Sequence, residues 1–430
     1  MSTPDTVADP EGDARRGTRS RAQAEVALRR CEELSLVTSR PGRIDRFHLT
    51  PEHARANALV GGWMQDAGMH TRQDAAGNLC GRLEGREPGL PALVLGSHLD
   101  TVPDAGRYDG PLGVMLAIAV VERLRGHTDD LPFAVEVYGF GDEEGTRFST
   151  ALLGSRAVAG SWRDDLWDLT DSGGTTLREA FVAFGLEPDR VHDAARDPAE
   201  VVGYLEAHIE QGPELEDAGL PLGVVSSIAG ARRFHLATLG QARHAGGTPY
   251  PRRRDALVGA SHAVIDIERI ARSRNVIATV GQLQAYPGGV NVIPGRVEFS
   301  LDLRAEHDAA RDAAWEAIQG AIHARCARLS LRFVSEEAHQ APAVTCAGWL
   351  QDAVAAGIRS TGQRTVPVLF SRAGHDGMAM AALTDIAMLF LRCDDGISHH
   401  PAEDVEADDV TVAVDAFETA VLRVAAQVQQ

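Results

Sequence analysis

The spacing of apolar and polar positions predicts helices alternating with buried strands over the first 150 residues. Helical periodicity begins near residue 21 and resumes at "LTPEHARANALVGGWMQDAGM", where Thr50 can cap the helix, Pro51 suits its first turn and Gly68 suits its end. The apolar runs "PALVLGSH" and "LPFAVEVYGFG" flank the apolar helix "GVMLAIAVVERLRG". Two strands that are apolar on both faces and joined by a helix indicate a parallel sheet.

The pattern changes between about residues 229 and 336. Strand-like "RRFHLATLG" precedes the helix "RDALVGASHAVIDIERIARS", and two strands follow, "VIATVGQLQA" and "RVEFSLDLR". The helix "DAARDAAWEAIQGAIHARCARL" and the strand "SLRFVSEE" complete the segment. This β-α-β-β-α-β order predicts a ferredoxin-like α+β unit.

Sheet-and-helix patterning resumes after this segment with "VPVLFS", "IAMLFLR" and a closing helix at 407–428, so the unit is an insertion. We therefore predict a discontinuous α/β catalytic domain, residues 21–228 and 337–430, around a central, mostly parallel sheet, with the inserted domain at 229–336. Residues 1–20 are polar, lack the apolar core of a signal peptide, and are expected to form a disordered tail.

Composition narrows the class of protein. At 430 residues two domains are the default expectation, and a net charge of −19 without a basic tract argues against a nucleic-acid partner. No apolar run approaches the roughly 18 residues of a membrane helix, so no membrane partner is expected. The five cysteines are scattered and form no CxxC pair, which favours reduced thiols and a cytoplasmic location.

Side chains that can bind metal recur where predicted strands end, and ligand sites of such sheets lie beyond the carboxyl ends of the strands. Imidazole and carboxylate suit zinc, while manganese accepts carboxylate more readily. Asp100 stands two residues past His98 and can take its other ring proton. Asp109 lies where its carboxylate could bridge two ions. The candidate ligands are His98, Asp109, Glu143, Glu144, His208 and His399.

The paired glutamates in "FGDEEG" suggest two different roles, a metal ligand and a general base. If one binds metal, the other is held close to the reacting water and can act as general base. Other interpretations stay open at this point: the segment 96–114 could be an acidic surface loop, His208 could be a core histidine, and either His399 or His400 could face the site.

Seven segments together resemble the carbamoylase branch of the dinuclear metallopeptidase–aminoacylase superfamily. This branch contains N-carbamoyl-L-amino acid hydrolases, β-ureidopropionases and allantoate amidohydrolases. The segments run in the family order over roughly residues 25 to 428. They are "GSHLDTVPDAGRYDGPLGV", "EEGTRFSTALLGSRA", "YLEAHIEQGPELE", "HAGGTPYPRRRDA", "GGVNVIPGRVEFSLDLR", "AGHDGMAMA" and "GISHHPAE".

The resemblance implies roles for the metal-site residues. His98, Asp109 and His208 would hold one ion, and Asp109, Glu144 and His399 the other, so that Asp109 is the bridge. Glu143 would be the general base. The family histidine directly follows the serine of "SHHPAE", which favours His399 over His400. Zinc, manganese, cobalt and nickel all suit these ligands.

The resemblance also implies that the inserted domain is a lid and dimerisation unit, which predicts a homodimer. His244 would polarise the scissile carbonyl, in the partner subunit's site, and Arg304 would clamp the substrate carboxylate together with Asn291. Gln211 and His375 would be further substrate contacts. Three positions depart from the family pattern and bear on specificity: Gly247, Tyr250 and Arg372.

The expected activity is therefore a two-metal hydrolysis of the ureido bond of an N-carbamoyl amino acid or of allantoate, releasing ammonia and carbon dioxide. The alternatives are a dipeptidase or aminoacylase with the same metal site, and a catalytically silent metal-binding dimer. "EEGTRF" and "HIEQGP" favour the carbamoyl branch, and the intact set of ligands and base counts against a silent relative.

Overall fold

The computed structural model describes residues 10–429 and divides the chain into two compact units. The larger unit comprises the chain up to Ser226, Cys346–Leu369 and the chain from Gly374 onward, and the smaller unit comprises Ser227–Thr345 and Phe370–Ala373. The predicted insertion is thus present, with boundaries near the expected 229 and 336. The smaller unit extends past residue 336 because β13 continues through a bulge between Glu337 and His339 to Ala341. The residues of this extension are mostly polar, so the sequence pattern did not predict a strand there.

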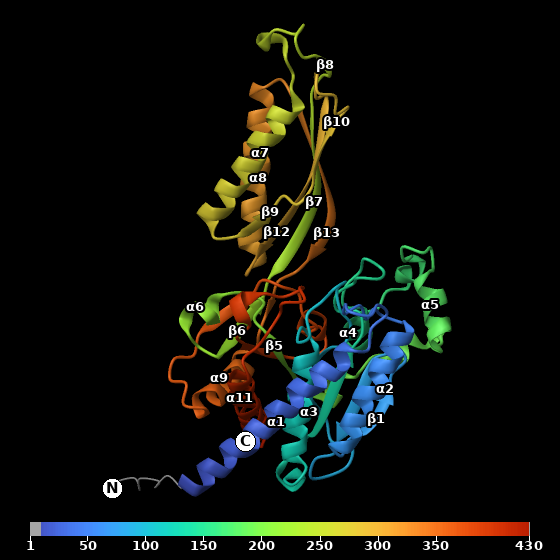
Figure 1. Cartoon of the computed structure of the whole chain (residues 1–430), viewed down its shortest axis with the longest axis vertical. Helices are drawn as coiled ribbons and strands as arrows, with labels where there is room; N and C mark the ends of the chain where they lie inside the picture. Colours follow the sequence, from blue (N-terminus) through green and yellow to red (C-terminus); the bar gives the residue numbers. More distant parts are fainter. Residues whose placement is uncertain (1–9, 430) are drawn as a thin grey trace. The chain divides into compact units, whose positions relative to one another are not determined.

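A nine-stranded mixed sheet forms the centre of the larger unit (Figure 1). Its four central strands, β4, β3, β5 and β16, run parallel, and antiparallel strands flank them. The expected parallel core, with β3 and β4 buried along their whole length, is confirmed. In sheet order the strands are β1 (His70–Gln73), β2 (Leu79–Leu83), β4 (Ala134–Phe140), β3 (Ala92–His98), β5 (Val201–Ile209), β16 (Ile386–Leu391), β6 (Leu222–Ile228) and β14 (Val344–Thr345), with β15 (Val368–Ser371) paired to β6.

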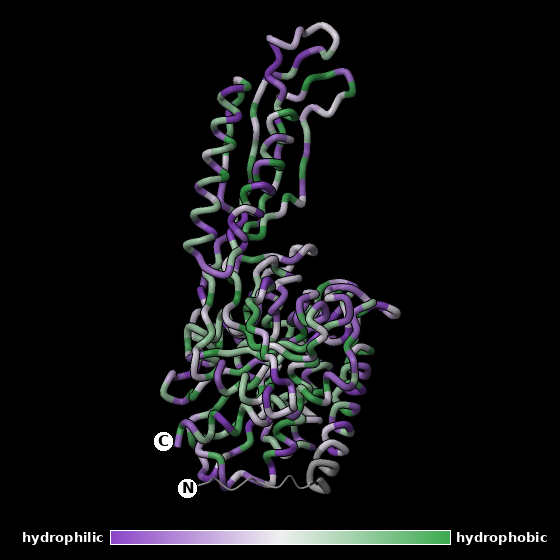
Figure 2. Tube along the Cα trace, turned by 90° about the vertical axis from the view of Figure 1, so that its left-hand side faces the viewer, coloured by the Kyte–Doolittle hydropathy of each residue, from purple (hydrophilic) through white to green (hydrophobic). Residues whose placement is uncertain are grey.

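Helices cover this sheet, and hydrophobic stretches run through the interior of the unit (Figure 2). The buried helix α3 contacts β3, β4 and β5, while α11 contacts α1, α3, α9 and β16, and α10 contacts β5 and β16. The helices are α1 (Pro10–Ser35), α2 (Pro51–Asp66), α3 (Pro111–Leu124), α4 (Leu153–Val158), α5 (Leu177–Phe184), α6 (Glu214–Ala218), α9 (Gly348–Ser360), α10 (Gly377–Met380) and α11 (Ala407–Val428). Within the described part of the chain, the 3-10 helices are η1 (Thr128–Asp130), η2 (Asp164–Asp168), η3 (Pro188–Ala194), η4 (Pro198–Glu200), η5 (Tyr250–Arg252) and η6 (Asp394–Gly396).

The ends of the helices show which local predictions hold. The Thr50 side chain accepts a hydrogen bond from the His53 N–H, and Pro51 starts α2, as expected. The prediction of a disordered tail over residues 1–20 is wrong for its second half, because α1 begins at Pro10. Ser20 is buried and donates to Asp415 of α11, a tertiary contact that a local pattern cannot reveal. Residues 1–9 lie outside the described residues.

The smaller unit has the predicted β-α-β-β-α-β order. Its antiparallel sheet runs β10-β12-β7-β13, with β9 also paired to β12. The run read as one strand, "VIATVGQLQA", is split into β9 and β10 because residues 280–282 leave the ladder. The elements are β7 (Gly230–Leu239), β8 (Arg243–His244), α7 (Ala256–Arg274), β9 (Ile277–Thr279), β10 (Leu283–Tyr286), β11 (Val292–Ile293), β12 (Arg296–Ala305), α8 (Asp308–Arg328) and β13 (Arg332–Ala341).

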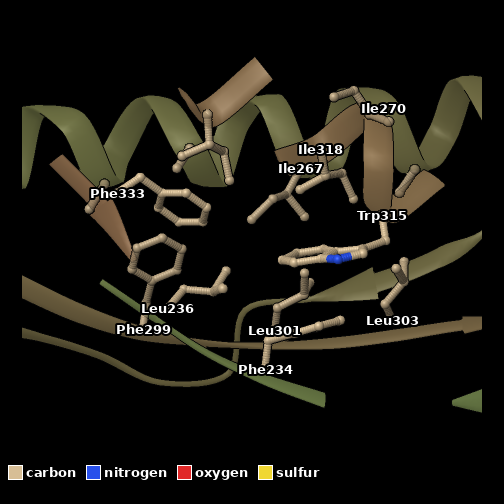
Figure 3. Close-up of a cluster of buried hydrophobic side chains, with 14 of the residues drawn as sticks. Phe234, Leu236, Ile267, Ile270, Phe299, Leu301, Leu303, Trp315, Ile318 and Phe333 are labelled. Carbon is tan, nitrogen blue, oxygen red and sulfur yellow. The ribbon is translucent and has the colours of Figure 1, made fainter. Parts of the chain in front are cut away.

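One face of this sheet carries the core of the smaller unit (Figure 3). Alternate residues of β7 and β12 point toward α7 and α8, as the two-residue period of a strand requires. Phe234 of β7 stacks on Trp315 of α8 with ring centroids 3.8 Å apart. The polar residues of β12 therefore lie on the opposite face, among them Asp302 and Arg304.

All five cysteines are free and buried. Among residues 10–429, no helix is both long and apolar enough to cross a membrane.

Candidate metal centre

The predicted ligands come together at the carboxyl edge of the parallel strands in the larger unit. His98 is the last residue of β3, His208 lies near the end of β5, and Glu143 and Glu144 follow β4. Because β4, β3 and β5 are parallel neighbours, their ends meet at one edge of the sheet. Asp109 precedes α3, and His399 follows η6.

Asp109 is the centre of this cluster. Its Oδ1 lies 3.2 Å from His208 Nε2 and 3.7 Å from His98 Nε2. Its Oδ2 lies 3.1 Å from His399 Nε2, which is also 3.3 Å from Glu144 Oε1. Each carboxylate oxygen thus faces a different set of imidazoles, which is the arrangement expected of a carboxylate that bridges two cations.

The donor atoms form groups compact enough to hold an ion. One comprises His98, Asp109 and His208, and a second comprises Asp109, Glu144 and His399. These are the two sets expected from the resemblance, and both contain Asp109. A further group, His98, Glu143 and Glu144, places the predicted general base beside the ligands.

The ambiguity between the two neighbouring histidines is resolved by the backbone. His399 has a left-handed conformation, with φ of 57°, and its imidazole faces Asp109 and Glu144. His400 is exposed, and its Nδ1 instead accepts the Ala402 N–H. The structure therefore favours His399 as the ligand.

The Asp100 side chain has a different role from the expected one. His98 Nδ1 lies 3.0 Å from the main-chain oxygen of Asp100, whereas the carboxylate is 3.7 Å away. The carboxylate instead accepts the N–H groups of Glu143 and Glu144, at 3.0 and 3.2 Å. Residue 100 thus fixes the His98 ring through its backbone and the turn that carries both glutamates through its side chain.

A second set of supporting contacts surrounds Asp109, and the sequence did not identify two of its members. Glu403 accepts the Asp109 N–H at 3.1 Å, and Ser398 donates to Glu403 at 2.8 Å and to Asp109 at 3.1 Å. Both lie within "SHHPAE", so a search for polar residues around His399 could have found them. Gln211, predicted to contact substrate, donates to Asp109 Oδ2 at 2.9 Å.

His375 is not placed as a substrate contact. Its side chain is 1% exposed, and its ring packs edge-on against His208 with centroids 4.4 Å apart. A ring with so little accessible surface is placed to pack against His208, a candidate ligand, and has little surface to offer a substrate. Glu206, two residues before His208 on β5, is also fully buried and accepts bonds from Ser97, Tyr204 and the Gly377 N–H.

The electrostatics agree with a cation site. Burial alone would raise the pKa of Asp109, but hydrogen bonds from His208, His399 and His98 hold it well below its usual range. The same contacts with Asp109 and Glu144 raise the pKa of His399 to about 10. The cluster thus keeps Asp109 ionised and attracts positive charge to it.

Glu143 differs from the glutamate beside it. Its side chain is buried, 8% exposed, and burial raises its pKa well above the ordinary value. A Cβ added at Gly374 would lie only 3.6 Å from its Oε1, so the loop of Gly374 covers this carboxylate. A carboxylate that takes up a proton readily and is shielded from water suits a general base.

The chemistry of the donors fits divalent cations. Three imidazoles and two carboxylates, Asp109 and Glu144, match the nitrogen and oxygen ligands of zinc, and the cysteines are absent from the cluster. His208 Nε2 is buried and faces Asp109 Oδ1 at 3.2 Å, while its Nδ1 lies 2.9 Å from the Ile209 carbonyl. With Nδ1 directed at that carbonyl, Nε2 is the ring nitrogen that could bind a metal ion.

Gly110 lets Asp109 approach His98. Its φ is 82°, and an added Cβ would lie 2.5 Å from the His98 ring. We expect Gly110→Ala to displace His98 or Asp109, so that metal content and kcat/KM both fall at least tenfold, because supporting residues of metal sites are worth about 10–100-fold. Elemental analysis and steady-state kinetics measure this.

Gly89→Ala is the matched control, because Gly89 has a φ of 79° and nothing within 4 Å of an added Cβ. It carries backbone strain of about 1–3 kcal/mol without the collision. Both variants are expected to melt earlier, but only Gly110→Ala should lose metal. Equal metal content in the two would contradict this account.

The smaller unit holds the remaining predicted residues. His244 of β8 pairs with Val292 of β11, and the Ala245 N–H donates to the Asn291 carbonyl, so His244 and Asn291 lie together on one short ribbon. Gly247, one of the departures, donates its N–H to His244 Nδ1 at 2.9 Å. A neutral His244 ring therefore carries its proton on Nε2, where it can donate to a carbonyl oxygen.

The other two departures are accommodated in different ways. Tyr250 is 82% exposed, with the Arg253 guanidinium 4.3 Å from its ring centroid. Arg372 replaces a usual glycine without backbone strain, because it is not among the residues with positive φ. Its guanidinium lies over the Phe370 ring at 5.3 Å, and its carbonyl accepts a bond from Arg304 at 2.8 Å.

This combination, a ligand cluster for divalent cations with an adjacent buried glutamate on a mixed α/β sheet, defines a metallohydrolase. A family model, Peptidase family M20/M25/M40, matches residues 94–423. The chain is 40% identical over 395 residues to an N-carbamoyl-L-amino acid amidohydrolase of Geobacillus stearothermophilus, covering 91% of this chain and 96% of the relative.

Two further comparisons agree. An allantoate deiminase of Arabidopsis thaliana is 38% identical over 418 residues, covering 90% of this chain and 80% of the relative. A crystal structure of a hydantoinase/carbamoylase family amidase from Burkholderia multivorans superimposes with a TM-score of 0.86 at 31% identity, covering 94% of this chain and 98% of that one. The chain therefore belongs to the peptidase family M20/M25/M40, in its carbamoylase branch, and is a metal-binding hydrolase of carbon–nitrogen bonds other than peptide bonds.

Proposed function

We propose that the protein hydrolyses the ureido C–N bond of an N-carbamoyl amino acid or of allantoate with two divalent cations. The observation that carries this proposal is the pair of ligand groups that share Asp109 beside the buried Glu143. Relatives whose names specify N-carbamoyl-L-amino acid and allantoate substrates support the choice of bond.

The chain's own residues define the steps. Two cations in this cluster would lower the pKa of a water molecule and polarise the ureido carbonyl. Glu143 takes the proton from the attacking water and passes it to the departing nitrogen. His244 donates its Nε2–H to the developing oxyanion, and Arg304 holds the substrate carboxylate. The carbamate product loses carbon dioxide, so one ureido group and one water yield the amine, ammonia and carbon dioxide.

We further propose that the enzyme is a homodimer in which His244 and Asn291 serve the partner subunit's site. Within the smaller unit, Arg304 lies at one end of β12, and the ribbon of His244 lies beyond the other end, past Arg296 (Figure 1). The eight residue steps from Arg296 to Arg304 span about 27 Å at roughly 3.4 Å per residue. One small substrate cannot touch both ends, so Arg304 and His244 can serve one site only from different subunits.

A panel of substrates tests the reaction. After chelation, zinc, manganese, cobalt or nickel is added back to the wild-type protein, and ammonia release is measured with N-carbamoyl-α-amino acids, β-ureidopropionate and allantoate. We expect metal-dependent ammonia release from at least one of the three. Amine release from N-acetyl amino acids or dipeptides, without ureido hydrolysis, would instead identify an aminoacylase or dipeptidase. No hydrolysis with any metal would identify a silent metal-binding protein.

A further inference from the structure

Asp302 lies between two arginines on the open face of the smaller unit's sheet. Arg304 follows two residues later on β12, on the same face, and Arg233 stands directly opposite Asp302 on β7. Arg233 Nε donates to Asp302 Oδ2 at 2.9 Å. The side chains of Asp302 and Arg304 are 27% and 29% exposed, whereas that of Arg233 is 54% exposed. The ion pair between Asp302 and Arg304 is therefore less exposed to solvent than the ion pair between Asp302 and Arg233.

Arg304 is held on two sides. Its Nε and Nη2 donate to the two oxygens of Asp302, at 2.8 and 3.4 Å, and its Nη1 donates to the Arg372 carbonyl at 2.8 Å. A guanidinium has five N–H groups. These three contacts leave one N–H on each terminal nitrogen, and two such groups can meet a carboxylate in a bidentate contact.

The Asp302 carboxylate is a firm anchor. Burial raises its pKa, but hydrogen bonds from Arg304 and Arg233 outweigh burial and hold the pKa below the usual range. It therefore stays ionised and keeps the Arg304 guanidinium in one orientation. A long side chain fixed before substrate arrives loses less rotamer freedom on binding.

We propose that Asp302 is a positioning residue that orients Arg304 to grip the substrate carboxylate, with the Arg372 carbonyl as the second anchor. Asp302 itself does not touch substrate. The proposal rests on the proposed function, in which Arg304 binds that carboxylate. The departure at position 372 leaves this anchor in place, because the contact uses the main-chain carbonyl and not the side chain.

The test compares two substrates that differ only in the group Arg304 would bind: the ureido acid that the wild-type protein hydrolyses, and the same compound with its carboxylate replaced by a carboxamide. In Asp302→Asn, KM for the acid should rise about tenfold, or 1.4 kcal/mol, with kcat nearly unchanged. KM for the carboxamide should stay within about twofold of wild type. An equal rise in KM for both substrates, as a general loss of structure would give, would overturn the proposal.

Two further variants sharpen the result. Arg233→Gln removes the other ion pair of Asp302 and leaves all three Arg304 contacts, so it should leave KM for the acid unchanged. In an Arg304→Ala background, Asp302→Asn should add no further increase in KM, because a positioning residue acts through the residue it positions. An additive increase would show that Asp302 acts independently of Arg304.

The direction of the change in KM distinguishes a positioning role of Asp302 from a purely electrostatic one. Removing a negative charge beside Arg304 would strengthen its attraction for a carboxylate, so a purely electrostatic role predicts a lower KM for the acid in Asp302→Asn. That outcome would overturn the proposal. Failure of the wild-type protein to hydrolyse N-carbamoyl-α-amino acids, β-ureidopropionate and allantoate alike would instead overturn the proposed function, before any variant is compared.

Discussion

Glu143→Gln is expected to lower kcat for ureido hydrolysis by about 10²–10⁴-fold, the contribution of a positioned general base. Glutamine keeps the shape and the buried setting of residue 143 but cannot take up a proton. Asp100 holds this position through the main-chain N–H, which the substitution leaves in place. The loss should therefore fall on the chemical step, with KM and the folded structure retained.

The neighbouring glutamate provides the contrast. Glu144 lies 3.3 Å from His399 and belongs to a ligand group with Asp109, so Glu144→Gln should lose activity together with bound metal. Elemental analysis, thermal unfolding and ammonia release on both variants separate the two roles. Near-normal hydrolysis by a folded, metal-loaded Glu143→Gln protein would remove Glu143 from the mechanism.

A mixed dimer of Glu143→Gln and His244→Ala subunits is expected to recover about half the wild-type activity per dimer, although each variant alone is nearly inactive. Loss of one oxyanion donor costs about 10²–10³-fold in kcat. If His244 serves the partner's site, one site of the mixed dimer combines both defects, and the other site combines an intact Glu143 with an intact His244. Differently tagged subunits, co-expressed and purified through both tags, supply this species.

The reciprocal dimer is the control. It pairs a wild-type subunit with a subunit that carries both substitutions, so every site has one defect if His244 acts across the interface, and activity should stay low. If His244 served its own subunit, the results would be reversed, with the double-variant dimer half active and the mixed dimer inactive. Isolation of the chain as a monomer with full activity would also exclude the shared site.

The sequence predicted which side chains gather at the carboxyl edge of the sheet because parallel topology restricts where strand ends can lie. Once β3, β4 and β5 are recognised as neighbours, His98, the glutamate pair and His208 must meet at one edge of the sheet. The backbone conformation at residue 399, which selects between adjacent histidines, depends on contacts with Asp109 and Glu144. No local pattern encodes that choice, so only the resemblance favoured His399 beforehand.

The roles of supporting residues were harder to predict. The His98 ring is held by the main-chain oxygen of Asp100. Every residue has such an acceptor, so the residue type does not reveal which one is used. The resemblance implied that His375 contacts substrate, yet its ring is buried against His208 because α10 packs on β5. Likewise, Arg304 is held by Asp302, two residues before it, and by the main-chain carbonyl of Arg372, 68 residues after it, and the second contact has no signal in the sequence.

The position of β16 has a consequence for synthesis of the chain. This strand, Ile386–Leu391, lies in the middle of the large sheet between β5 and β6, although it leaves the ribosome after the other strands of that sheet. The smaller unit is mostly one continuous stretch, Ser227–Thr345, and is expected to fold while translation proceeds. Until β16 is synthesised, β5 and β6 lack the strand that pairs with both of them. A chain that stops short of β16 should therefore aggregate or be degraded rather than accumulate as a partly active enzyme.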